Sequence, residues 1–284
     1  MNDSARSVLT LFAQALKRLF ADEAIPLAGN IAFRVIFSMF PFLIFLTSLA
    51  GFFGSSELAQ AIVNYLLSVA PEQLVRPLAP EISSILTVPR SGLLSLSALL
   101  TIWSAMGGVD SIRVALNRAY DLKDTRPIWY LYIQNVVFVV GAAALLLAVA
   151  VLLVVYPVLV NALETYAPNT LARFASFDYV RYPLAMALLL FGLHVAHRIL
   201  PAKAQSARMV FPGVFLTLIV WTLLSAAFSY YLVHFNSFAS TYASLSGLFA
   251  AMLFVYQAAL VLIFGGEFNR VLSLLKGASG NEPL

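Results

Sequence analysis

The chain of 284 residues contains no cysteine and little charge. Without cysteine it can form no disulfide, no thiolate nucleophile and no cysteine-ligated metal or iron–sulfur site. Charged residues make up 11% of the chain and hydrophobic residues 61%, whereas a soluble domain has about 25% charged and about 45–50% apolar residues. The mean hydropathy is +0.90. This composition predicts a protein that works within a membrane.

Six long apolar stretches occupy most of the chain, and each is close to the ~20 residues that a helix needs to cross ~30 Å of hydrocarbon. A backbone amide without a partner is costly in hydrocarbon, so each stretch is predicted to be a helix. The predicted spans are 30–53, 92–109, 131–156, 181–200, 210–234 and 243–265. We therefore expect an all-α, polytopic membrane protein, a six-transmembrane-helix bundle that forms one integral membrane domain over 1–284.

The chain also lacks the short motifs of common enzymes. It has no G-x-x-x-x-G-K-[ST] phosphate-binding loop, no G-x-S-x-G elbow and no H-E-x-x-H helix. His194 and His197 share one helical face, but no third ligand is close to them in sequence. We expect no metal site, no cofactor and no enzymatic activity.

Basic residues gather on one predicted side of the membrane, 12 against 4, with Arg34 left within a span. The first side carries Arg6, Lys17, Arg18, Arg113, Arg118, Lys123, Arg126, Arg198, Lys203, Arg208, Arg270 and Lys276, and the other carries Arg76, Arg90, Arg173 and Arg181. Because Lys and Arg in short loops stay in the cytoplasm, both termini are predicted to be cytoplasmic. The loop 54–91 should then be external, with amphipathic helical segments.

The segment 6–20 has the pattern of an amphipathic helix, with basic residues away from its apolar face. Its predicted apolar face consists of Leu9, Phe12, Leu16, Leu19 and Phe20. Two interpretations fit this pattern equally well. The helix lies in the membrane interface, or it packs on the bundle.

Arg34 and Pro41 are the unusual residues of the first span. A charge within the bilayer is costly, so Arg34 either faces a polar cavity or extends back to the headgroups. Pro41 removes a backbone hydrogen bond inside the helix, so it is a candidate kink, although proline also occurs in membrane helices for packing reasons.

The second span continues into a polar segment after Gly107 and Gly108, a pair that permits a kink or a close backbone approach. Asp110 and Arg113 are one helical turn apart and are predicted to pair. The candidate vestibule residues here are Asp110, Arg113, Asn117 and Arg118. The alternative is a plain amphipathic helix at the interface.

The last span provides further candidates. Ala243, Gly247 and Ala251 recur every four residues, a small-residue motif that lets two helices pack closely. Tyr242 precedes them and is a candidate for lining an outer cavity. Glu267, at the cytoplasmic end, is a candidate counter-ion for Arg34 or Arg113, or else a carboxylate that extends to the surface.

Three blocks of the chain resemble the YihY/BrkB family of bacterial inner-membrane proteins, once misnamed after ribonuclease BN. The blocks are Ile31-Ala32-Phe33 with Phe37-Ser38-Met39-Phe40-Pro41-Phe42; Trp103-Ser104-Ala105, Gly108-Val109, Ala115-Leu116-Asn117-Arg118-Ala119-Tyr120 and Arg126-Pro127; and Leu200-Pro201, Pro212-Gly213, Ser240-Thr241-Tyr242-Ala243-Ser244-Leu245 and Gly266-Glu267-Phe268-Asn269. Arg34 and Val35 depart from the pattern, which has Tyr and Thr there. The resemblance implies a multi-pass protein of the bacterial inner membrane, linked to virulence and to export of lipids or small solutes.

Two classes of function follow. The first is a transporter or flippase of a lipid or small solute, in which Arg113 and Arg118, with Arg34, attract an anionic group and membrane lipids are the expected partners. No nucleotide-binding motif is present, so an ion gradient or passive movement would drive it. The second is a non-transporting scaffold or regulator of envelope assembly, which would have a solid bundle without a cavity. Dispersed carboxylates make RNA hydrolysis unexpected, and we expect no nucleic-acid partner.

Overall fold

The computed structural model describes residues 3–53, 91–156, 178–234 and 239–279, with positions 60, 63, 64 and 80. The regular secondary structure of these residues is helical, without a strand. Six helices are long and apolar enough to cross a membrane, which confirms the all-α, multi-pass fold. The predicted loop helices at 54–91 lie almost entirely outside the described residues.

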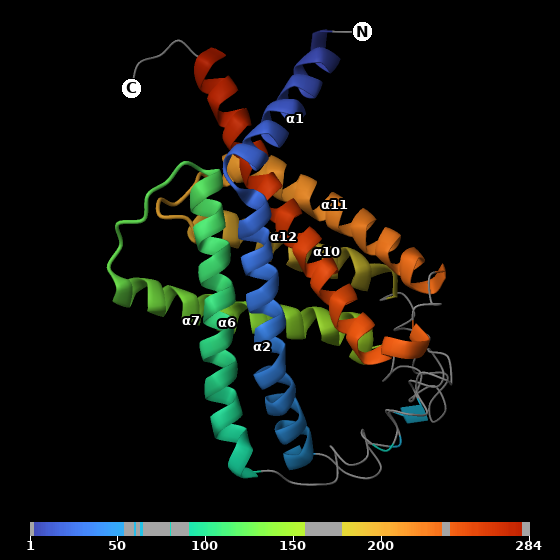
Figure 1. Cartoon of the computed structure of the whole chain (residues 1–284). Helices are drawn as coiled ribbons and strands as arrows, with labels where there is room; N and C mark the ends of the chain where they lie inside the picture. Colours follow the sequence, from blue (N-terminus) through green and yellow to red (C-terminus); the bar gives the residue numbers. More distant parts are fainter. Residues whose placement is uncertain are drawn as a thin grey trace.

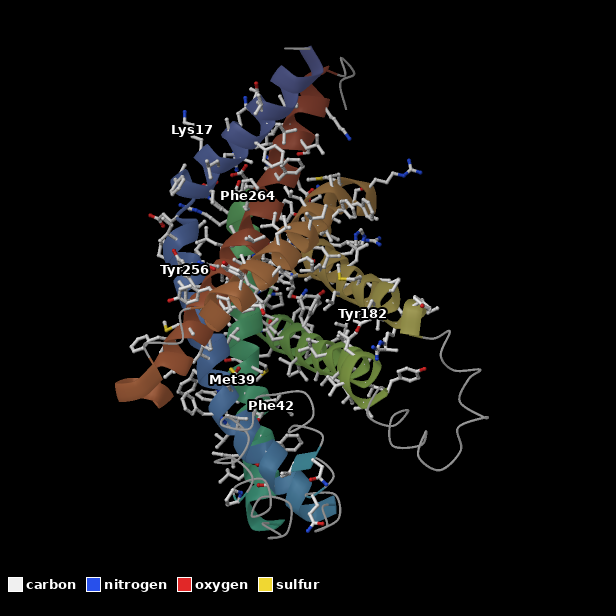
Figure 2. The ribbon with its side chains drawn as sticks, turned by 90° about the vertical axis from the view of Figure 1, so that its right-hand side faces the viewer. Lys17, Met39, Phe42, Tyr182, Tyr256 and Phe264 are labelled. Atoms are coloured by element: carbon white, nitrogen blue, oxygen red, sulfur yellow. The ribbon has the colours of Figure 1, made fainter. Side chains whose placement is uncertain are left out.

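Each spanning helix begins before its predicted apolar stretch, and α6 and α12 also end well beyond theirs. They are α1 (Asp3–Ala21), α2 (Ala24–Phe53), α6 (Ser91–Ala119), α7 (Ile128–Ala150) with a π-helical continuation η1 (Val151–Val155), α10 (Asp178–Ile199), α11 (Ala207–His234) and α12 (Ala239–Ser279). α2 and α6 run antiparallel side by side, and α7 runs across them (Figure 1). Figure 2 shows the same pair from the side.

The polar continuation of the second span belongs to the bundle core. α6 is continuous through Gly107 and Gly108 to Ala119. Leu116 and Tyr120 are fully buried, against Val210 and Val214 of α11 among others. The apolar stripe of 110–120 is therefore a core face that packs against α10, α11 and α12.

α1 packs on α12, as one of the two interpretations of the N-terminal segment expected. Leu11 and Ala15 pack against Val271, and the ring of Phe12 lies 5.2 Å from that of Phe268. The two helices cross near one end of the bundle (Figure 1). Most of the predicted apolar face is nevertheless exposed, namely Leu9, Phe12, Leu16 and Phe20. The small side chain of Ala15 sets the contact face instead, because it lets α12 approach closely.

α11 and α12 approach each other closely where they cross. A Cβ on Gly213 would lie 2.1 Å from the backbone oxygen of Gly265, and a Cβ on Gly265 would lie 2.1 Å from Oγ1 of Thr217. Neither site has room for a side chain, so both glycines are required for this crossing.

The predicted close-packing motif lies elsewhere on α12. Gly247 is exposed, and a Cβ there would meet no described atom within 4 Å. Ala251 is half-buried. The side chains of Tyr242 and Ala243 lie outside the described residues. Gly247 therefore makes no close helix contact within the part of the chain that the structure describes.

Candidate functional site

An open cleft of about 570 Å³ lies between α2, α6 and the first turns of α7. Its lining residues are Asn30, Phe33, Arg34, Phe37, Trp103, Ser104, Met106, Gly107, Asp110, Arg113, Ile128, Leu131, Tyr132 and Asn135. The cleft exists because α7 crosses the α2/α6 pair and contacts it only in part (Figure 1). It brings Arg34, Gly107, Asp110 and Arg113, candidates from two separate helices, to one site.

Asp110 and Arg113 form the charged end of this cleft. Nη2 of Arg113 donates to Oδ1 of Asp110 at 2.6 Å, which confirms the predicted pair. Nη1 of Arg113 also donates to Asp124. The side chain of Arg113 is 8% exposed, so two carboxylates stabilise a nearly buried cation.

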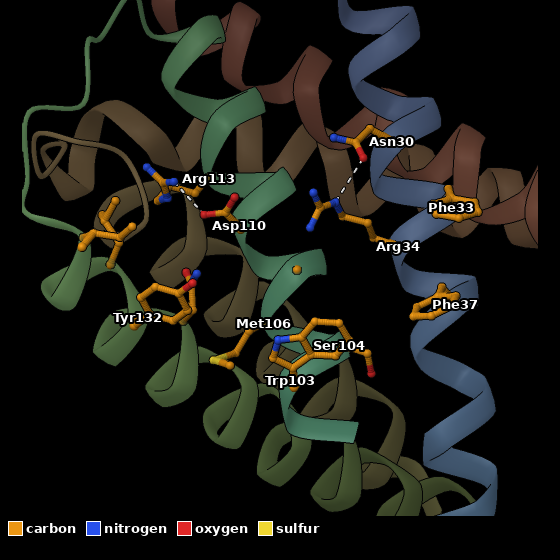
Figure 3. A pocket seen from close by; sticks show the side chains of 14 residues that line it. Asn30, Phe33, Arg34, Phe37, Trp103, Ser104, Met106, Asp110, Arg113 and Tyr132 are labelled. Atoms are coloured by element: carbon orange, nitrogen blue, oxygen red, sulfur yellow. Dashed lines mark hydrogen bonds and ion pairs between the residues drawn. The ribbon is translucent and has the colours of Figure 1, made fainter. Parts of the chain in front are cut away.

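Arg34 lies in the cleft and points from α2 towards α6 (Figure 3). Its Nε donates to Oδ1 of Asn30 at 3.2 Å. A Cβ on Gly107 would lie 2.7 Å from Nη1 of Arg34, so glycine at 107 leaves the space that the guanidinium occupies. A Cβ on Gly108 would lie 3.8 Å from Cγ2 of Val35, which is an ordinary van der Waals distance. Gly107 thus permits the close approach of Arg34, and α6 continues as a helix through both glycines.

Aromatic residues form the apolar part of the cleft. Phe33, Phe37 and Trp103 are all more than 45% exposed although they line it. Exposed apolar side chains of a membrane-spanning bundle are expected to contact lipid, so we expect the cleft to open towards the lipid-facing surface. Pro41 lies inside α2 one turn beyond Phe37, where it is half-buried.

Asp124, which sequence reasoning missed, organises the loop that follows α6. Its Oδ1 and Oδ2 accept from Nε and Nη2 of Arg126 at 2.8 and 2.7 Å, and Oδ2 accepts from Asn117 at 3.2 Å. The hydrogen bonds from Arg126, with further ones from Arg113, hold the pKa of Asp124 well below its usual value. Asp124 is therefore ionised at neutral pH and fixes the orientation of Arg113.

Asn117 and Arg126 connect this loop to the turn between α10 and α11. Oδ1 of Asn117 accepts from the backbone N–H of Ala202 at 2.6 Å, and Nη2 of Arg126 donates to the carbonyl of Leu200 at 3.0 Å. Asn117 is thus a structural bridge that holds the bundle together at this end, and it does not line the cleft.

Glu267 pairs with Arg18, a partner that was not predicted from the sequence. It is fully buried, and its Oε2 accepts from Nε of Arg18 at 2.9 Å. The predicted partners Arg34 and Arg113 were wrong, and the alternative of a carboxylate extending to the surface was wrong as well. Arg18 also contacts Asp121, which Arg270 bonds at 3.0 Å. This network fixes α1 to the bundle outside the cleft.

A second group of buried polar residues stabilises the core near the same end. Nδ1 of His197 lies 2.9 Å from the hydroxyl of Tyr120, which also accepts from Nδ2 of Asn269 at 3.2 Å. Asn269 Oδ1 accepts from the backbone N–H of Gly213 at 2.7 Å. Among the described residues no group of acidic residues and histidines could hold a metal ion. His197 is therefore a core residue, bonded to Tyr120.

Arg118 lies apart from Arg34 and Asp110. Its Nε is 3.8 Å from Asp22, and its side chain is 54% exposed. With Asn117 and Asp124 it borders a smaller hollow of about 340 Å³, which Arg113 also lines. Arg113 is thus the residue that the cleft and this hollow share.

Comparison with known proteins gives one family over almost the whole chain. Residues 15–283 match the sequence model of the family described as Virulence factor BrkB. A ribonuclease-like protein of Bacillus subtilis, YfkH, is 28% identical over 94% of this chain and 98% of its own length. A UPF0761 membrane protein of Alteromonas mediterranea is 23% identical over 94% of this chain and 89% of its own length. No solved structure matches the chain significantly.

Proposed function

The chain belongs to the BrkB virulence-factor family of membrane proteins, and we propose that it carries a lipid or small solute across a bacterial inner membrane as an exporter or flippase. The end of the bundle that contains the loops 120–127 and 200–206 would face the cytoplasm, because it carries most of the loop arginines and lysines. The chain would act as a carrier and not as an enzyme.

One observation supports this proposal above others, namely an open cleft with charged and apolar parts between membrane-spanning helices. Charged groups at such positions are costly, and in membrane proteins they commonly border the path of a substrate or ion. A scaffold that only packs against partners has no need of such a cleft. The chain has no nucleotide-binding loop, so movement would be passive or coupled to an ion gradient.

The test is transport by the purified protein in liposomes of phosphatidylglycerol and phosphatidylcholine. Two probes are used, a fluorescent phospholipid whose transfer between leaflets is read by dithionite quenching, and entrapped inorganic phosphate. We expect the wild type to accelerate movement of one probe. Met106→Trp, which fills the cleft without changing a charge, should return that rate to the protein-free value. Leu146→Trp, at an exposed site outside the cleft, is the matched control and should keep it.

Equal rates with and without wild-type protein would contradict the proposal. So would equal activity of the two tryptophan variants, because transport would then not use the cleft. In the first case the alternative is a scaffold or regulator of envelope assembly, and crosslinking in cells would be used to find its protein partner.

A further inference from the structure

Arg34 is a cation in the cleft without a carboxylate partner among the residues that the structure describes. Its Nε bonds Asn30, while Nη1 and Nη2 have no hydrogen-bond acceptor there. Arg113, the other arginine of the cleft, has two carboxylates. A guanidinium has five N–H donors and binds phosphate with two of them at once. The uncompensated charge of the cleft therefore lies on Arg34.

The fold leaves space for the side chain of Arg34 beside α6. Its Nη1 lies where a side chain on residue 107 would be, since a Cβ there would be 2.7 Å away. Glycine at this position of α6 thus lets the guanidinium lie against the cleft wall. A guanidinium without an anionic partner in a membrane is unfavourable, so this arrangement favours an anion bound beside it.

Asn135 provides a second, independent observation. It comes from α7, lines the same cleft and is 5% exposed, and its Oδ1 has no hydrogen-bond partner in the structure. A buried amide oxygen without a partner costs free energy. A hydroxyl or ammonium group of a ligand in the cleft would donate to it.

The remaining wall indicates an amphiphile. Phe33, Phe37 and Trp103 form an apolar surface that continues onto the lipid-facing side of the bundle. Figure 3 shows Phe33 on α2 level with Arg34, Phe37 below it on the same helix, and Trp103 on α6. Inorganic phosphate would leave this surface uncovered, whereas an acyl chain would cover it.

We propose that the cleft binds a phospholipid. Its phosphate lies on Arg34, a donor group of its head bonds Asn135, and one acyl chain lies along Phe33, Phe37 and Trp103. This rests on the proposed function that cargo occupies the cleft, and it narrows that cargo to a phosphate-bearing amphiphile that enters from the bilayer.

The test is binding to the full chain in detergent, followed by native mass spectrometry. The probes are phosphatidylglycerol, a diacylglycerol with the same chains, and inorganic phosphate. We expect phosphatidylglycerol to bind most tightly. Arg34→Gln should weaken the binding of phosphatidylglycerol by about tenfold or more, and Arg34→Lys should recover part of that affinity. The control Arg118→Gln should leave the affinity for phosphatidylglycerol unchanged. Asn135→Leu removes the unpartnered amide without a folding penalty, and it should also weaken the binding of phosphatidylglycerol.

Unchanged phosphatidylglycerol binding in both Arg34→Gln and Asn135→Leu would overturn the proposal. Inorganic phosphate that binds as tightly as phosphatidylglycerol would overturn the lipid part, and diacylglycerol that binds equally well would overturn the role of the phosphate. The two proposals fail separately. Arg34-dependent binding without transport in liposomes contradicts the proposed function alone, and transport with Arg34-independent binding contradicts this inference alone.

Discussion

At the scale of single residues, Arg113 and Asp124 show how this chain keeps a charge at the edge of an apolar bundle. A buried ion requires both an opposite charge and hydrogen bonds. Arg113 has Asp110 and Asp124, and Asp124 in turn accepts from Arg126 and Asn117. The two ions stabilise each other and keep Arg113 directed at the cleft.

Asp124→Asn tests this arrangement through its pH dependence. The pKa of Asp124 is lowered in the fold, so its ionised form stabilises the fold at pH values above the usual pKa of 3.8. This stabilisation is lost as the pH falls below 3.8 towards the lower pKa of the folded state. We expect the substitution to lower stability at pH 7 by about 3 kcal/mol, because it leaves Arg113 with one carboxylate. The difference from the wild type should shrink below pH 3.8. Thermal unfolding in detergent at several pH values measures it.

The control for that prediction is Asp110→Asn, which removes the other carboxylate of Arg113. The side chain of Asp110 is 37% exposed, and exposed pairs contribute about 0–1 kcal/mol. Its effect should be clearly smaller. A loss for Asp124→Asn that is equal at neutral and acidic pH would show that Asp124 acts through packing and not through its charge.

At the scale of helices, the crossing of α11 and α12 depends on small residues at the contact and on Asn269. Asn269 bonds the backbone of α11 twice, at the N–H of Gly213 and at the carbonyl of Val210. Pro212 lies inside α11 and has no N–H of its own. Close packing and these side-chain hydrogen bonds together replace the hydrophobic driving force that helix association lacks in lipid.

Gly213→Ala should disrupt this crossing, because its Cβ would lie 2.1 Å from the oxygen of Gly265 and 2.6 Å from the side chain of Asn269. Overpacking of this kind costs about 1–3 kcal/mol. The matched control is Gly247→Ala on α12, where the space is open; it should be neutral or stabilising, since alanine favours helix by up to about 1 kcal/mol. Unfolding in detergent compares them. Equal effects of the two substitutions would contradict the assigned crossing.

This contrast explains part of what the sequence could not reveal. The repeat Ala243, Gly247 and Ala251 is visible because its members lie on one helix. Gly213 and Gly265 lie on different helices, so their contact is set by how α11 crosses α12. Within one helix prediction was more accurate, and the ion pair of Asp110 and Arg113 was predicted because its members are one turn apart.

At the scale of the whole molecule, the six spans could be predicted because hydropathy reports directly on the bilayer. The cleft could not be predicted from the sequence, since it depends on the angle at which α7 crosses α2 and α6. The network that fixes α1 to the bundle could not be predicted either. Arg18 and Glu267 are 249 residues apart, and each had nearer candidate partners in the sequence. Asp124 was missed because it lies in a short loop outside the spans.

The orientation of the whole chain is a prediction that its lack of cysteine makes direct to test. Ala204, exposed in the loop 200–206, should face the cytoplasm, and Glu72, in the loop 54–91, should face outside. In intact cells a membrane-impermeant maleimide should label Glu72→Cys, and it should label Ala204→Cys only after permeabilisation. The unmodified chain is the control for background labelling. Labelling of Ala204→Cys in intact cells would contradict the predicted topology and would place the charged end of the cleft outside.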